Sequence, residues 1–210
     1  MEKKRIDARM LTGMAMITAI IVILQYLAIF LRVMGIFSVS LVLVPIVVGA
    51  ALYGVWAGVW FGFVFGIVVL ISGDAALFLP VNPLGTILVV LLKGALAGLC
   101  AGLVYKALSK FDSQIVLLVK GEEKWGADVS VILAAIVCPI VNTGIFLLGC
   151  LVFFMPTINE WAAAAHFDNV GKYMIFGLVG GNFLFELLLN IILSPVIVRL
   201  IKVGRHDWTH

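Results

Sequence analysis

The chain has 210 residues, of which 64% are hydrophobic and only 12% charged, and its formal net charge is +3. A water-soluble domain of this length could not cover so much apolar side chain with polar surface, so a soluble fold is excluded. The apolar residues form long runs rather than the short alternation of barrel strands, which excludes a transmembrane β-barrel. The composition predicts an all-α integral membrane protein with one domain, residues 1–210.

A basic leader precedes the first apolar segment, and turns or polar connections separate the later ones. The first segment is too long for a signal peptide, and no small-residue cleavage site follows it, so we expect a retained helix. The pattern predicts six transmembrane helices, over residues 11–31, 39–52, 55–71, 84–106, 129–154 and 171–201.

Small residues recur at every fourth position in three of these helices, which places them on one helix face and allows close helix approach. Ala15 and Ala19 form such a pair in the first helix. This pair indicates either packing within the chain or a face that docks a partner. We expect close helix packing at seven glycines, namely Gly54, Gly58, Gly62, Gly66, Gly94, Gly98 and Gly102.

The connections and prolines define the remaining layout. Pro45 is expected to kink the second helix or break its upper part, and Pro139 to interrupt the fifth helix. Residues 72–82 and 155–170 are expected to be loops, and 109–128 is the longest polar connection.

Lysine and arginine are distributed unequally between the two sides of the predicted bundle. The side with both termini carries eleven of these residues and the opposite side carries two, Arg32 and Lys172. By the positive-inside rule, both termini are cytoplasmic in the plasma membrane. The loops around Gly35, Asp74 and Trp161 then face outward.

Lys93 stands near the middle of an apolar helix, where an ammonium in hydrocarbon is costly, so it must face protein, water or a ligand. Asn142 and Asn182 fall at a similar depth on two other helices, and Thr143 follows Asn142. Few convergent polar groups between apolar walls are typical of a small-molecule pocket.

The alternative is that Lys93 pairs with Glu186 and binds no ligand, although such a pair could also line the cavity. Glu186 and Asn190 lie deeper than the other polar groups and are expected to be a second shell or an ion pair that supports the fold.

No motif for catalysis or energy coupling is present in the sequence. There is no GxxxxGK followed by Ser or Thr, no HExxH, no paired cysteines and no GxSxG. His166 with Asp168 is read as a solvated loop pair rather than a metal site. We therefore expect no enzyme activity, no metal and no cofactor.

The chain resembles the S components of energy-coupling factor (ECF) vitamin transporters, which are their substrate-binding membrane subunits. The resemblance covers nearly the whole chain and rests on the order of its motifs: a basic leader, Ala15-xxx-Ala19, Pro45 with the passage Gly49-Ala50-Ala51-Leu52-Tyr53-Gly54, Asn82-Pro83-Leu84, and Val141-Asn142-Thr143.

The resemblance implies that the chain captures a vitamin from outside and docks, within membrane lipid, on a transmembrane T subunit carrying two ATPases. It also implies docking through Ala15 and Ala19, and an outward pocket built by helices four to six and capped by the outward loops. The expected substrate-binding residues are Lys93, Asn142, Thr143, Asn182, Asp74 and Trp161.

A lysine in the pocket favours a ligand with a carboxylate, so pantothenate or a folate is weakly favoured over riboflavin. Two other classes of function stay open. A self-sufficient secondary carrier or channel would accumulate substrate alone, although the halves show no inverted repeat. A non-transporting structural subunit would bind no ligand.

Overall fold

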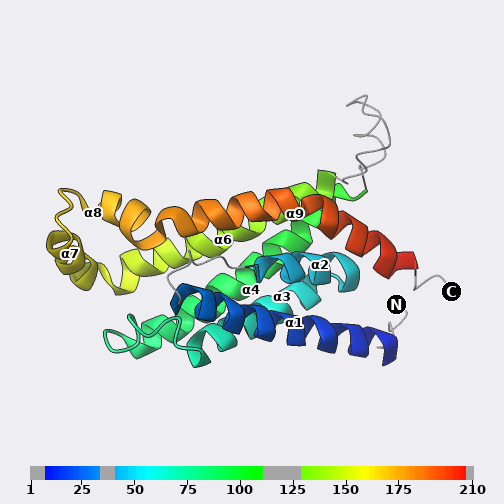
Figure 1. Ribbon diagram of the computed structural model, residues 1–210, viewed down its shortest axis with the longest axis horizontal. Helices are drawn as coiled ribbons and strands as arrows, with labels where there is room; N and C mark the ends of the chain where they lie inside the picture. The colour runs from blue at the N-terminus through cyan, green and yellow to red at the C-terminus, as the bar shows by residue number, and fades with distance from the viewer. Residues whose placement is uncertain (1–7, 34–40, 111–128, 207–210) are drawn as a thin grey trace.

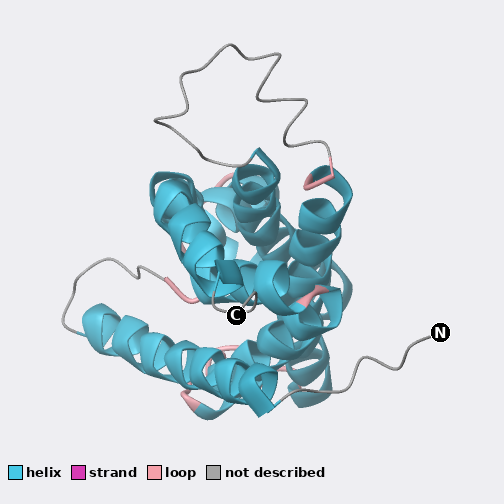
Figure 2. Ribbon diagram, turned by 90° about the vertical axis from the view of Figure 1, so that its right-hand side faces the viewer, coloured by secondary structure: helices cyan, strands magenta, loops and turns pink. Residues whose placement is uncertain are grey.

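The computed structural model describes residues 8–33, 41–110 and 129–206. Most of the basic leader, the turn at Gly35 and most of the connection 109–128 lie outside the described residues. The described part is all-helical (Figures 1 and 2). Its elements are α1 (Ala8–Val33), α2 (Leu43–Tyr53), α3 (Val55–Ile71), α4 (Pro83–Leu108), α6 (Val129–Phe153), α7 (Met155–Ala164), α8 (Val170–Lys172), the π-helix η2 (Tyr173–Val179) and α9 (Gly180–His206).

Among the described residues, four segments are long and apolar enough to cross a membrane: Ala8–Leu31, Pro83–Leu108, Val129–Phe153 and Asn182–Ile201. The helix α2 is much shorter. Its eleven residues rise about 16 Å at 1.5 Å per residue, roughly half the hydrocarbon thickness of a bilayer. The start of α1 and the end of α9 lie at the same end of the bundle (Figure 1).

Glycines let α3 and α4 come into backbone contact. A Cβ atom on Gly62 would overlap the carbonyl oxygen of Gly94, and a Cβ on Gly94 would overlap that of Gly62. Gly58 and Gly98 face each other in the same way one turn along. The four-residue spacing in the sequence thus corresponds to a seam in which two helix backbones touch.

Gly54 differs from the expectation that it packs between helices. It is the single residue between α2 and α3, its φ is 99°, and nothing lies within 4 Å of a Cβ placed there. Its value is conformational, because a residue with a side chain rarely adopts that φ. The one-residue turn reverses the chain and sets α3 beside α2.

Both prolines expected to disturb helices are accommodated. The helix α2 begins at Leu43, so Pro45 falls in its first turn, where no intrahelical partner for an N–H is needed. Pro139 lies inside α6, which runs from Val129 to Phe153 without a break. Neighbouring helices in membrane bundles commonly support such prolines.

The segment 155–170 is not the loop that its polar residues suggested, because α7 occupies most of it. Pro156 lies at its start, a run of alanines favours the helix, and Ile158 and Ala162, four residues apart, are buried. The last predicted helix is divided instead: η2 ends at Val179, and α9 begins at Gly180, whose φ is 43°.

Candidate ligand-binding site

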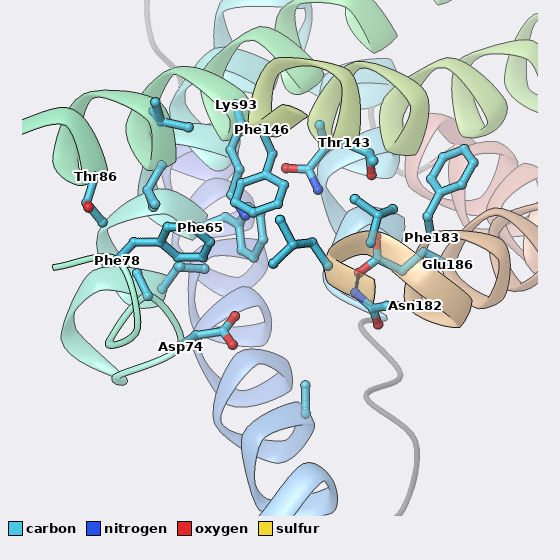
Figure 3. A pocket seen from close by; sticks show the side chains of 18 of the residues that line it. Phe65, Asp74, Phe78, Thr86, Lys93, Thr143, Phe146, Asn182, Phe183 and Glu186 are labelled. Carbon is cyan, nitrogen blue, oxygen red and sulfur yellow. Dashed lines mark hydrogen bonds between the residues drawn. The ribbon is translucent and has the colours of Figure 1, made fainter. Parts of the chain in front are cut away.

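A cavity of about 330 Å³ is lined by the second half of α1, the first half of α4 and the first residues of α9 (Figure 3). These parts of the helices lie away from the end of the bundle that holds the start of α1 and the end of α9 (Figure 1). The wall of the cavity is formed by residues of α1, α3, α4, α6, η2, α9 and the segment between α3 and α4. Its wall is largely apolar and aromatic, with Phe65, Phe78, Phe146, Phe154 and Phe183. Its polar side chains are Gln25, Asp74, Thr86, Lys93, Asn142, Thr143, Asn182 and Glu186.

Lys93 reaches this cavity from α4 and is held between two aromatic rings. Its Nζ lies 5.8 Å from the ring centroid of Phe65 on α3 and 5.4 Å from that of Phe146 on α6. Each ring face carries negative potential, which stabilises an ammonium at such distances. Figure 3 shows the side chain of Lys93 beside both rings in the cavity wall.

Asn142 and Thr143 enter the wall from α6. Asn142 is 7% exposed, and its Oδ1 has no hydrogen-bond partner among the described residues. A buried acceptor without a partner costs about 1–3 kcal/mol, so such atoms are uncommon and call for an explanation.

On α9, Asn182 and Glu186 are four residues apart and share one helix face. The Nδ2 of Asn182 donates to Oε1 of Glu186 at 3.3 Å (Figure 3). Glu186 is 5% exposed and lines the cavity, although its predicted depth in the membrane suggested that it only supports the fold. Asn190, one turn further on, is not part of the wall; its Nδ2 donates to the backbone oxygen of Glu186 at 2.8 Å.

Asp74 comes from the segment between α3 and α4, which closes one side of the cavity. Nε2 of Gln25 on α1 donates to Oδ2 of Asp74 at 3.1 Å, and Gln25 is 2% exposed. This bond ties the segment to the first helix. Sequence reasoning missed Gln25, although an amide inside an apolar span is a detectable signal.

The start of α4 is fixed by a cap that places Thr86 in the wall. Oδ1 of Asn82 accepts from the backbone N–H of Gly85 at 3.0 Å, and Oγ1 of Thr86 donates to the backbone oxygen of Asn82 at 2.8 Å. Pro83 follows the cap residue, where its missing N–H is not needed. The cap thus sets the register that carries Lys93 to the cavity.

Trp161, expected to touch substrate, does not line the cavity. Its ring packs edge-to-face against Phe78 at a centroid distance of 5.5 Å, and Phe78 in turn forms part of the wall. Phe78 also meets Phe146 at 5.5 Å and Phe154 at 5.1 Å. Trp161 therefore lies behind an aromatic layer that it supports from α7.

The two alanines expected to dock a partner are both exposed on α1. Gln25 and Ala28 are the α1 residues in the cavity wall, and they lie further along the helix. Gln25 is six positions after Ala19, which corresponds to about 9 Å of helix rise. The small-residue face and the cavity are thus separate features of one helix.

His166 and Asp168 are exposed beyond α7. Among the residues that the structure describes, no group of three or more His, Cys, Asp or Glu side chains is arranged to hold a metal ion.

A cavity with aromatic walls and a few convergent polar groups, inside an apolar helical bundle, defines a membrane protein that binds a small molecule. A family model described as "ECF transporter, substrate-specific component" matches residues 9–201. The chain belongs to this family, whose members are transporter subunits that bind a small-molecule substrate and associate with the ECF module, and not enzymes. No match was found among curated proteins or among solved structures.

Proposed function

We propose that this chain is the high-affinity substrate-binding subunit of an ATP-driven ECF importer, and that it captures a small vitamin from outside. The observation that carries the proposal is the cavity of about 330 Å³, with apolar walls and a few polar side chains, in a chain of the ECF substrate-specific family. The sequence has no P-loop. Energy must then come from partners, a T subunit and two ATPases.

We further infer six membrane crossings with both termini in the cytoplasm. The charge distribution supports this orientation, because eleven basic residues lie on the side of the termini. The residues that line the cavity come from the parts of α1 and α9 away from the termini, so the cavity would open outward. In this arrangement α2 and α3 are two successive crossings joined at Gly54.

We propose that the ligand carries an acidic group that meets Lys93. An ammonium held between two rings in an apolar wall is a suitable partner for a carboxylate. The cavity volume of about 330 Å³ lies at the lower end of the range of roughly 300–1,000 Å³ for ligand pockets. Of the two acids that the sequence favoured, this size supports pantothenate over a folate.

Mass spectrometry of small molecules that co-purify with the detergent-extracted chain tests the proposal. We expect one vitamin, present in a defined ratio to protein and released on denaturation. A chain that carries no small molecule, and that no vitamin stabilises against heat, would support a structural membrane subunit instead.

A further inference from the structure

A second cavity, of about 410 Å³, forms a groove between α1, α2 and α9. The helix α2 packs against both of the others and lies between them (Figure 1). Of the residues that line the groove, only Tyr53 carries a polar group. None of them lines the cavity that contains Lys93. The groove is therefore a separate feature, and vitamin binding does not use it.

The length and width of the groove limit what can occupy it. Leu24 is eleven positions after Gly13 along α1, which corresponds to about 16 Å of helix rise. The hydrocarbon of one bilayer leaflet is about 15 Å thick, half of the whole. Over this length, the volume of about 410 Å³ corresponds to a cross-section of roughly 25 Å².

This cross-section decides between a protein helix and a lipid chain. A helix with its side chains is about 10–12 Å wide and needs roughly 80 Å² or more. A hydrocarbon chain is about 4 Å wide, by the contact distance between carbon atoms. The groove therefore accommodates a hydrocarbon chain of one leaflet and is too narrow for a helix.

One end of the groove is basic. Arg9 stands one turn before Gly13 on the same face of α1, Arg199 directly precedes Leu200 on α9, and both arginines are exposed. The start of α1 and the end of α9 share one end of the bundle (Figure 1). The acidic residues that the structure describes lie elsewhere, in the ligand cavity or in and after α7: Asp74, Glu160, Asp168 and Glu186.

We propose that the groove binds one acyl chain of an anionic phospholipid whose headgroup meets Arg9 and Arg199. The chain fills an apolar wall that would otherwise lack van der Waals contacts, and the phosphate accepts charge-assisted hydrogen bonds from the two guanidinium groups. Anionic lipids are a component of the cytoplasmic leaflet, which is the side inferred for both termini. This lipid site goes beyond the proposed function and is independent of the vitamin.

The test uses the full-length chain in detergent, mixed with equal amounts of phosphatidylglycerol and phosphatidylcholine that carry the same acyl chains. Native mass spectrometry measures how much of each lipid stays bound. Ile20→Trp fills the groove, and Ile23→Trp is its matched control, because Ile23 is also exposed on α1 but does not line the groove. Arg9→Gln removes one charge from the basic end, and Lys106→Gln, at an exposed lysine of α4, is its control.

We expect the wild type to retain phosphatidylglycerol in preference to phosphatidylcholine. Arg9→Gln should lower this preference by roughly fivefold, as for one basic residue near an anionic surface, and adding Arg199→Gln should lower it again by a similar factor. Ile20→Trp should lose the bound lipid, whereas Ile23→Trp and Lys106→Gln should retain it. If Ile20→Trp does not fold, Met16→Trp, at another exposed position in the groove, is measured in its place.

Three results would overturn the inference. Equal retention of both lipids by the wild type would mean that the arginines select no headgroup. Undiminished retention of phosphatidylglycerol by Ile20→Trp would place the lipid elsewhere on the surface. A wild type that retains neither lipid would have no lipid site in the groove. Vitamin affinity is measured separately on the same preparations, so failure of the proposed function is distinguishable from failure of the lipid site.

Discussion

Lys93 is the residue whose contacts test the proposed recognition of an acidic ligand. Its Nζ lies over the rings of Phe65 and Phe146 in the cavity wall. We expect Lys93→Met to lower ligand affinity by roughly ten- to a hundredfold, because it removes a charge-assisted hydrogen bond. Titration calorimetry on the detergent-purified variant measures this. The variant should fold, since methionine suits a membrane helix; unchanged affinity would remove Lys93 from the site.

The same residue also separates the ligand interpretation from an ion pair with Glu186. If the two pair, Lys93→Met leaves a buried carboxylate without its cation, and the melting temperature should fall. Adding Glu186→Gln would then restore the melting temperature. Under the ligand interpretation, the double variant stays weak in binding, and its stability differs little from that of Lys93→Met. Measuring both quantities on both variants distinguishes the two roles.

Among single residues, the polar ones were the predictable part of the site. Lys93, Asn142, Thr143 and Asn182 were singled out because polar groups in apolar spans are costly, and all four line the cavity. The aromatic residues of the wall could not be predicted from the sequence, because a phenylalanine in an apolar helix can face lipid, the protein core or a ligand. Trp161, expected at the substrate from a loop, lies on the helix α7 and packs against Phe78 rather than in the cavity wall.

At the scale of elements, the seam between α3 and α4 is the most specific packing feature. Gly62→Ala places a methyl group against the backbone carbonyl of Gly94, which cannot move aside as a side chain can. We expect a loss of roughly 1–3 kcal/mol of stability, as for other overpacked sites. Thermal unfolding in detergent measures the change as a lower melting temperature.

Gly144→Ala is the matched control for this change. Gly144 lies inside α6, and nothing is within 4 Å of a Cβ placed there. Alanine is the better helix former by about 1 kcal/mol, so its melting temperature should stay the same or rise. An equal loss in both variants would mean that helix contact at Gly62 is not the cause.

Helix position was more predictable than helix termination. The bounds of α3, 55–71, coincide with the predicted segment, since Gly54 and Ser72 enclose a purely apolar run. The prediction that Pro139 interrupts its helix was wrong, because α6 continues through it. Neighbouring helices can offset the cost of a proline inside a membrane helix, and a sequence does not show that packing. The division at Gly180 was missed because glycine is common in membrane helices and gives no unique signal.

At the scale of the whole molecule, the cavity and the exposed alanines of α1 are separate features, which predicts that binding and transport can be uncoupled. Replacing Ala15 and Ala19 with Trp should abolish ATP-driven uptake by the reconstituted complex, because bulky rings keep a partner helix away. Ligand affinity should be nearly unchanged. Leu27→Trp, at another exposed position of α1, is the control for the added bulk and should still transport.

One result would contradict the interpretation that Ala15 and Ala19 dock a partner. A drop in affinity of about tenfold or more with the complex still assembled would show that the alanine face serves the cavity and not a partner.

The family resemblance seen in the sequence is confirmed by the family match over residues 9–201. The sequence could predict the family because motifs such as Asn82-Pro83 and Asn142-Thr143 occur in a characteristic order and spacing along the chain. The lengths of the helices were harder to predict from the sequence. Only four segments reach membrane-spanning length among the described residues, and α2 contributes eleven residues, because tertiary packing sets where a helix begins.

The central claim is that this chain binds its vitamin alone and transports it only with partners. The most direct test is uptake into vesicles of the radiolabelled vitamin that the purified chain binds, with and without a T subunit, two ATPases and internal ATP. We expect binding in both preparations and ATP-dependent accumulation only in the complete complex. Accumulation in vesicles that contain this chain alone would contradict the account and indicate a self-sufficient carrier.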